Sequence, residues 1–266
     1  MERAVSRAIT SLNNPTVKAV RALHMRKARE ESGQFLAEGL KIVTEAVELG
    51  RAPRTLLYSA EAGVHPLLRQ AQAATEASGG EVIEVSREIL AKISRRDNPQ
   101  TVLAVFDQAF TPLDQLEPSA ARCWVALQAV RDPGNLGAVI RTADAAGCGG
   151  VILVGDCCDP YSVEAVRATM GSVFAVKIAR AAEGQFIGWR PRWPGAVVGT
   201  LLTARTDFRA ATYAPPTLIL MGNEQAGLPP ELARLCDETV KIPMRGRADS
   251  LNLAVATGIM IYAATA

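Results

Sequence analysis

Three segments in the second half of the chain combine glycines with side chains that could bind or activate a substrate. They read RDPGNLGAVIRTADAAG over residues 131–147, LMGNEQAGLPPEL over 220–232 and IPMRGRADSLNL over 242–253. Each lies at the end of a predicted strand. Because ligands of open α/β sheets bind beyond the carboxyl ends of the strands, these segments form the candidate site.

The first segment carries a cation in an otherwise apolar helix, which we expect over 138–147 with Arg141 in its second turn. Helical side chains lean toward the helix N-terminus, so this guanidinium can reach the mouth of the turn near Asn135. A fixed cation there suits a phosphate or a developing oxyanion. A glycine-rich turn alone is more often structural, and this one has neither G-x-G-x-x-G nor G-K-[ST], so no nucleotide loop of those types is supported.

The other two segments hold polar residues whose simplest interpretations are structural. Gly222 permits a ligand to approach the backbone, and Glu224 reads, taken alone, as an acid favoured near a helix start. Ser250 is the expected N-cap of the last helix. Asn252 then falls inside an apolar helix start, where a buried amide would need partners.

Alternating strand and helix patterns position these segments on a parallel sheet covered on both faces. The strands expected in the second half are 123–130, 150–154, 196–200, 217–221 and 239–242. The first half predicts a smaller α/β domain, with strands at 54–58, 82–85 and 102–106, helices at 40–49 and 66–77, and a helix after Ser86. The predicted organisation is a domain over 1–112, a proline-containing linker over 113–119 and a second domain over 120–266.

Composition excludes several classes of protein. With 48% apolar and 21% charged residues, the 266-residue chain is globular rather than disordered. Five cysteines without a C-x-x-C pair, and only two histidines, favour neither disulfides nor a zinc site, and we expect no metal. The first ten residues lack the apolar core of a signal peptide, and the longest uncharged run, 250–266, is too short and polar for a membrane span. We expect a soluble cytoplasmic protein.

The net charge of +2 conceals two basic clusters in the first half. Residues 1–29 hold seven basic residues against one acid, and a second cluster precedes the turn at 97–99. A solvated helix face explains the first cluster as well as a binding surface does. Two such clusters in one half favour a polyanion partner, and the candidate RNA contacts are Arg21, Arg26, Lys27, Arg95 and Arg96.

Taken together, the three segments resemble the three signature motifs of the SpoU (TrmH) family of SPOUT RNA methyltransferases. The matching stretches are DPGNLGAVIRTADAAG, LILMGNEQAGLPPEL and IPMRGRADSLNLAVATGIMIYA, in the family's order and with its spacing. The resemblance covers about residues 120–266. More loosely, SLNNPTVKAVRAL and FLAEGLKIVTEAV in the first half resemble the substrate-binding domain that often precedes this catalytic domain.

This resemblance implies a parallel α/β domain with a deep trefoil knot, preceded by a smaller α/β substrate-binding domain. It implies S-adenosylmethionine as methyl donor and a homodimer that completes the active site across its interface. The matching catalytic or active-site positions are Asn135, Arg141, Glu224, Ser250 and Asn252. The matching donor contacts are Thr200, Leu201, Gly222, Ile242 and Leu251.

The reaction implied is methyl transfer to a ribose 2′-hydroxyl of RNA, a poor nucleophile that must be placed in line with the methyl group. The family proposal makes Arg141 the base, assisted by an RNA phosphate. A guanidinium, however, stays protonated in proteins. An equally good interpretation is that Arg141 orients the phosphate and stabilises the developing alkoxide. Asn135 and Ser250 would position the ribose or Arg141, and Asn252 and Glu224 would organise the pocket.

Four alternatives remain at this point. Methyl transfer to a base atom, as in some SPOUT relatives, is disfavoured by the SpoU-type motifs. The substrate could be transfer RNA, although the added first domain favours ribosomal RNA. The chain could be a non-catalytic RNA-binding relative, but such a protein would be expected to lack Arg141 or Asn135. A nucleotide-dependent oxidoreductase would need the glycine spacing that the first segment lacks.

Overall fold

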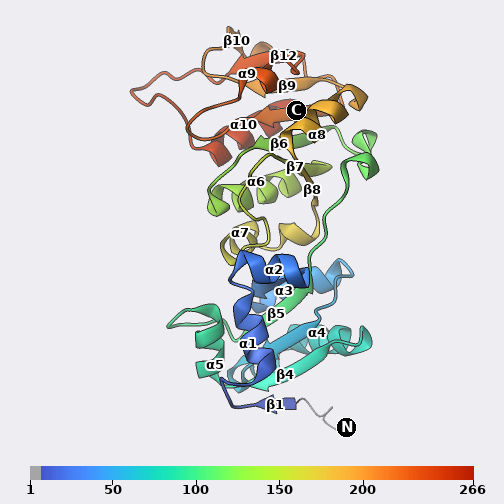
Figure 1. The fold of residues 1–266 in the computed structure, drawn as a ribbon, viewed down its shortest axis with the longest axis vertical. Coiled ribbons are helices and arrows are strands. Elements are labelled where there is room, and N and C mark those ends of the chain that lie inside the picture. Colours follow the sequence, from blue (N-terminus) through green and yellow to red (C-terminus); the bar gives the residue numbers. More distant parts are fainter. Residues whose placement is uncertain (1–6) are drawn as a thin grey trace. The chain divides into compact units, whose positions relative to one another are not determined.

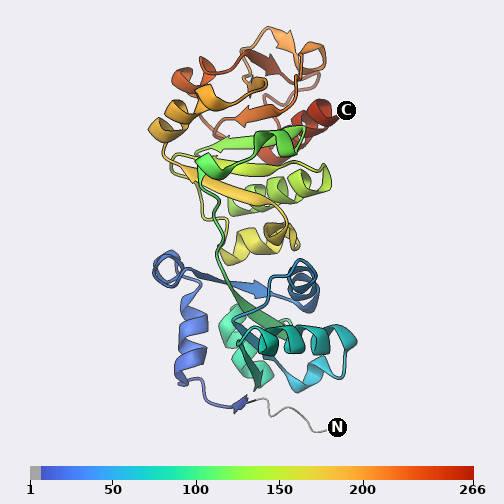
Figure 2. The ribbon, with the colours of Figure 1, turned by 90° about the vertical axis from the view of Figure 1, so that its right-hand side faces the viewer.

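The computed structural model describes residues 7–266, which divide into two compact units, each shown in Figures 1 and 2. Unit 1 contains the chain up to Gln108 together with Tyr161–Phe174. Unit 2 contains Ala109–Pro160 and Ala175–Ala266. No helix among the described residues is long and apolar enough to cross a membrane.

Unit 1 is built on a mixed five-stranded sheet of order β1-β4-β3-β5-β2. Its strands are β1 (Arg7–Ile9), β2 (Gln34–Glu38), β3 (Thr55–Tyr58), β4 (Glu81–Val85) and β5 (Val102–Asp107). β1, β4 and β3 run parallel, whereas β5 is antiparallel to both β3 and β2. The three strands predicted here are confirmed. The sequence did not indicate β1 or β2, because β1 has three residues and β2 passes directly through Gly39, at φ +104°, into a helix.

The helices of unit 1 cover both faces of this sheet. They are α1 (Pro15–Ala22), α2 (Arg26–Ser32), α3 (Leu40–Glu48), α4 (Pro66–Ala77) and α5 (Arg87–Ser94). α1 and α5 pack together on one face, where Val20, Leu90 and Leu103 share a buried core (Figure 1). α3 and α4 pack on the strands and on each other. Ser86 caps α5 as predicted, its hydroxyl accepting a hydrogen bond from the Ile89 N–H at 3.3 Å.

A segment from the second half of the sequence completes unit 1. α7 (Val163–Thr169) follows a strand of unit 2 in sequence yet packs on β2, with Val163 in the core that contains α1 and α5. The Phe35 ring lies 4.6 Å from that of Tyr161, and the Arg167 guanidinium pairs with Glu38 at 2.6 Å. The compact units therefore differ from the continuous domain predicted over 120–266. Such a docked crossover leaves no composition shift for sequence analysis to detect.

The Arg167–Glu38 pair gives a test of this docking. We expect Arg167→Ala to lower the free energy of unfolding by about 2 kcal/mol, because it leaves a buried carboxylate uncompensated. The effect is smaller than for a fully buried pair because Arg167 is 36% exposed while Glu38 is 4% exposed. Urea denaturation measures the change. Adding Glu38→Gln should recover most of the loss; if Arg167→Ala alone is neutral, the pair does not secure α7.

Unit 2 is an entirely parallel seven-stranded sheet of order β10-β12-β9-β11-β6-β7-β8. Its strands are β6 (Cys123–Gln128), β7 (Gly150–Val154), β8 (Lys177–Ala181), β9 (Val197–Thr200), β10 (Thr206–Asp207), β11 (Thr217–Met221) and β12 (Glu238–Lys241). The five predicted strands are confirmed. β8 and β10 escaped prediction because both are edge strands, one with an exposed lysine and arginine and one of two residues.

Helices α6 (Pro133–Ala145), α8 (Glu183–Trp189), α9 (Pro230–Ala233) and α10 (Leu253–Thr265) belong to unit 2. α6 and α10 pack against each other, and α10 also packs on β6 and β11 (Figure 1). A second core gathers Trp124, Trp189 and Trp193. The predicted linker over 113–119 contains a 3₁₀ turn and the start of another. Leu116 of this segment is buried in the same core. The segment therefore belongs to unit 2.

Candidate active site

The strand order brings the carboxyl ends of β6 and β11 together, with β9 and then β12 beside them. Leu127 pairs with Met221, so the chain leaves these two central strands side by side. The three candidate segments therefore begin at one edge of the unit 2 sheet. This is the edge at which α/β sheets bind ligands.

The first segment is helical earlier than the sequence predicted. α6 begins at Pro133 rather than Ala138, and the Asp132 carboxylate caps it by accepting a hydrogen bond from the Asn135 N–H at 2.6 Å. Aspartate followed by proline is a strong helix-start signal that outweighs the two glycines. Asn135 thus lies in the first turn, and Arg141 in the third turn rather than the second.

Arg141 is the available cation of this segment. It lies six residues after Asn135, a rise of about 9 Å along the helix. Its side chain is exposed and makes no hydrogen bond or ion pair to any described residue. Arg131, by contrast, is held by Asp156 at 2.7 Å. A guanidinium without a protein partner can bind an anion without first breaking a contact.

Asn252, not Ser250, caps the last helix. Its side-chain oxygen accepts hydrogen bonds from the Ala254 and Val255 N–H groups at 2.9 and 3.3 Å. Its side-chain nitrogen donates to the Asn135 side-chain oxygen at 2.8 Å. The amide is exposed rather than buried, and Ser250 lies exposed two residues before the cap. Asparagine is as good an N-cap as serine, so local pattern alone could not decide between them.

Glu224 extends this contact to the second segment. Its Oε1 accepts a long hydrogen bond, 3.4 Å, from the Asn135 side-chain nitrogen. The three segments are thereby linked through Glu224, Asn135 and Asn252. The dipole interpretation of Glu224 is not supported, because the next helix, α9, begins only at Pro230.

Asn223, which was not among the residues predicted from the sequence, ties the first two segments together. Its side-chain nitrogen donates to the Ala129 carbonyl at 2.8 Å, and its oxygen accepts from the Gln225 N–H at 2.9 Å. Ala129 has φ +48°, a strained conformation for alanine that this contact helps to hold. Gly222 is required beside it, since a Cβ there would lie 2.2 Å from the Gly227 carbonyl carbon. An asparagine in a tight turn after a strand is the signal that could have indicated this role.

The two hydrogen-bonding roles of Asn252 can be separated by substitution. We expect Asn252→Ala to lower the free energy of unfolding by about 1 kcal/mol through loss of the cap. Asn252→Ser should keep that stability, because a serine hydroxyl also caps a helix, but should lose the contact with Asn135. Thermal and urea unfolding measure the first effect, and methyl-transfer rates the second. Equal stability of the alanine and serine variants would contradict the capping role.

Four of the five residues expected to contact a donor lie at the same edge of the sheet. Thr200 ends β9, Leu201 follows it, Gly222 follows β11 and Ile242 follows β12. Leu201 and Ile242 are half-buried, and Leu251 is 36% exposed despite its size. Incompletely buried aliphatic side chains at strand ends suit a flat heterocycle such as adenine. The residues present therefore fit an adenosyl group.

The cysteines near this edge are not nucleophiles. All five are free, and Cys157 and Cys158 lie in the loop that follows β7. Burial raises the pKa of the Cys158 thiol to about 12, and burial likewise raises the pKa of Cys157. Both stay protonated at neutral pH and are poor nucleophiles. The described residues contain no group of three or more side chains that could hold a metal ion.

The two basic clusters of unit 1 lie on neighbouring elements. The His24 ring, just after α1, contacts the Ile93 carbonyl of α5 at 2.6 Å, so Arg21 and Arg95 project from packed helix ends. Burial, together with the nearby Arg95, lowers the pKa of His24. Arg26 and Lys27 are exposed but pair with Glu30 and Glu31 along α2, and Arg29 is buried. Arg96 is half-buried.

A parallel α/β unit with linked polar loops at adjacent strand ends defines a ligand-binding enzyme domain of the open-sheet class. The chain belongs to the SpoU rRNA methylase family, whose model matches residues 122–262. Residues 14–104 match the MRM3-like substrate binding domain.

Several known proteins are similar to this chain over nearly its whole length. A 23S rRNA (uridine(2479)-2′-O)-methyltransferase of Streptomyces viridochromogenes is 34% identical, over 97% of this chain and 92% of the relative. The 23S rRNA (guanosine(2553)-2′-O)-methyltransferase RlmP of Bacillus subtilis is 30% identical, over 96% and 97%. The crystal structure of an AdoMet-bound rRNA methyltransferase from Sinorhizobium meliloti is 51% identical with a TM-score of 0.91, covering 97% of both chains.

Proposed function

We propose that this protein transfers the methyl group of S-adenosylmethionine to a ribose 2′-hydroxyl of ribosomal RNA. The observation that carries the proposal is the Glu224–Asn135–Asn252 linkage at the strand ends of a SpoU-family unit, with the unpartnered Arg141 in the third turn of the same helix as Asn135. Relatives covering nearly the whole chain are named as 23S rRNA 2′-O-methyltransferases, which favours ribosomal over transfer RNA. Such a substrate implies a cytoplasmic enzyme.

The chain's own residues have to position a weak nucleophile and balance charge. When bound, S-adenosylmethionine supplies an electrophilic methyl group on a sulfonium. Arg141 binds a phosphate next to the target ribose and stabilises negative charge as the 2′-oxygen loses its proton and bonds to the methyl carbon, whose bond to the donor sulfur would break to leave a neutral thioether. A guanidinium keeps its own protons, so the hydroxyl proton passes to the bound phosphate or to water. Asn135, fixed by Glu224 and Asn252, and Ser250 orient the ribose.

The basic clusters of unit 1 supply sequence-independent contacts to the RNA backbone. Arg21, Arg95 and Arg96, on the packed ends of α1 and α5, form the main part of this surface. Arg26 and Lys27 contribute less, because each must leave an acidic neighbour to bind phosphate. Binding by such contacts weakens steeply with salt.

We propose a homodimer, and a trefoil knot at the C-terminus, for unit 2. α10 is apolar on every side: part of it packs on α6, β6 and β11, but Val255 and Tyr262 are 53% and 57% exposed. An exposed apolar stripe of this kind marks an interaction surface. The return of α10 from β12, which lies next to the edge strand β10, to the centre of the sheet supports the knot.

The direct test is methyl transfer from labelled S-adenosylmethionine to total RNA from a strain lacking this protein. Label in a 2′-O-methylated nucleoside of ribosomal RNA is the expected result, and nucleoside analysis with RNA fractionation detects it. Label on a base would overturn the acceptor, and label in transfer RNA would overturn the substrate. Donor binding without any transfer to ribosomes, subunits or free RNA would overturn the proposed activity.

A further inference from the structure

Unit 1 has a pocket of about 300 Å³ that the proposed chemistry does not use. It opens where the parallel strands β1, β4 and β3 end and α5 begins. The residues that matter for its chemistry are Ile9, Ser59, Glu61, Glu84, Val85 and Arg87. Its volume lies at the lower end of the range for small-ligand sites, enough for one nucleobase and part of its sugar.

Ser59 provides the strongest sign that this pocket receives a ligand. The residue is 3% exposed, yet its hydroxyl has no hydrogen-bond partner among the described residues. Its main chain is satisfied, with the N–H donating to the Thr101 carbonyl at 3.0 Å. Buried hydroxyls almost always have a partner, so the wall of this pocket holds an unfilled hydrogen-bonding position.

The charges around the pocket decide which ligand suits it. Two carboxylates, Glu61 and Glu84, accompany a single cation, Arg87. Arg87 is fixed by Glu61 at 3.2 Å and by the Asn98 side chain at 2.9 Å, and Glu84 accepts a hydrogen bond from the Tyr58 hydroxyl. A phosphate would meet two negative charges here. A planar base with N–H donors on one edge and acceptors on another meets a carboxylate, a guanidinium and the apolar surface of Ile9 and Val85.

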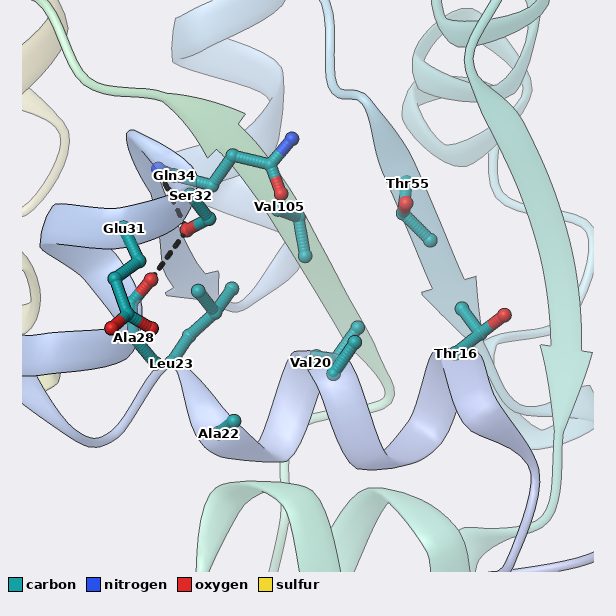
Figure 3. A pocket seen from close by; sticks show the side chains of 11 residues that line it. Thr16, Val20, Ala22, Leu23, Ala28, Glu31, Ser32, Gln34, Thr55 and Val105 are labelled. Carbon is teal, nitrogen blue, oxygen red and sulfur yellow. Dashed lines mark hydrogen bonds between the residues drawn. The ribbon is translucent and has the colours of Figure 1, made fainter.

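A second pocket in unit 1, of about 380 Å³, shows the contrast (Figure 3). It lies between α1, α2 and the ends of β2, β3 and β5. Its Ser32 hydroxyl is satisfied within the protein, donating to the Ala28 carbonyl at 2.7 Å and accepting from the Gln34 N–H at 3.2 Å. The Ser32 hydroxyl of the larger pocket therefore needs no ligand. A larger volume alone does not make this pocket the better candidate for a ligand site.

We propose that the pocket at Ser59 and Glu84 binds one unpaired guanine base of the RNA substrate. Guanine offers N1–H and N2–H donors to a carboxylate such as Glu84, while O6 and N7 accept from Arg87, which is its common partner in nucleic-acid recognition. Adenine lacks a ring N–H next to its amino group, so it cannot donate two adjacent hydrogen bonds to a carboxylate. Unpaired bases are the usual targets of sequence-specific RNA binding. The inference rests on the proposed RNA-methylating function and adds to it a base that unit 1 recognises.

The first test measures binding of short fluorescent uridine oligomers to the full-length protein by anisotropy. The probes carry one central guanosine, adenosine or inosine, the last lacking the 2-amino group. We expect the guanosine probe to bind about 10-fold more tightly than the adenosine probe, with inosine between them. Glu84→Gln should remove this preference, because an amide offers only one acceptor and adds a donor. Glu81→Gln, the same change at the exposed start of β4, should keep it.

Cross-linking checks the position without any substitution. A probe with central 6-thioguanosine is irradiated with the wild-type protein, and the adduct is mapped by mass spectrometry. Adducts within 59–61 or 84–87 are expected. Equal binding of all probes, a preference that survives Glu84→Gln, or adducts elsewhere would each overturn the guanine site. If ribosomal RNA is nevertheless methylated on ribose, only this inference fails; if no RNA is bound or methylated, the proposed function fails with it.

Discussion

Replacing Arg141 by alanine is expected to lower the rate of methyl transfer at least about 100-fold. The affinity for S-adenosylmethionine should change little, because the proposed donor contacts follow β9, β11 and β12 rather than the third turn of α6. The expected size follows from the loss of a preorganised cation at the oxygen that gains charge in the transition state. Single-turnover methylation and calorimetric donor binding measure the two quantities separately.

Two further variants make this result specific. Arg141→Lys should recover only part of the rate, since an ammonium cannot bind a phosphate through two parallel hydrogen bonds. Arg192→Ala removes an exposed arginine of unit 2 away from the strand ends and should leave the rate unchanged. Near-normal transfer by Arg141→Ala would exclude both the base and the electrostatic role for this residue. A parallel loss of donor binding would show instead that Arg141 supports the fold of the site.

The general architecture of unit 2 could be predicted because its central strands are apolar on both faces and end in recognisable loops. β6, β7 and β11 are buried apolar runs, and helical stretches between the strands indicate a parallel sheet. The edge strand β8 could not be recognised, because its exposed lysine and arginine break the apolar run. The start of α6 was misplaced because its glycines obscured the capping signal of Asp132.

The site could be predicted as a set of residues but not as a set of contacts. Asn135 and Asn252 are 117 positions apart, and only the packing of α10 on α6 brings their side chains within 2.8 Å. Local pattern assigned the helix cap to Ser250 because serine and asparagine are equally good caps. The docking of α7 in unit 1 was equally hidden, since its partners Glu38 and Phe35 lie more than a hundred residues earlier in the chain.

The apolar stripe of α10 leads to the second large effect. Introducing a carboxylate with Val255→Asp or Tyr262→Asp is expected to convert the proposed dimer into monomers and to abolish methyl transfer. Val255 and Tyr262 are seven residues apart, so they lie on one face of the helix, and both are more than half exposed. A charge buried in an apolar interface without a partner costs several kcal/mol, which is enough to dissociate many dimers. Multi-angle light scattering gives the mass, and methyl transfer gives the activity.

The control separates loss of the interface from loss of the fold. Val64→Asp places the same charge on an exposed valine of unit 1 and should change neither mass nor activity. The α10 variants should unfold as cooperatively as an isolated wild-type protomer, because neither side chain belongs to the buried core. If the wild-type protein is a monomer, the proposed dimer does not exist. If the variants stay dimeric, the dimer contact lies elsewhere. Monomeric variants with full activity would show that Arg141, Asn135 and Asn252 of one chain form a complete site without a partner.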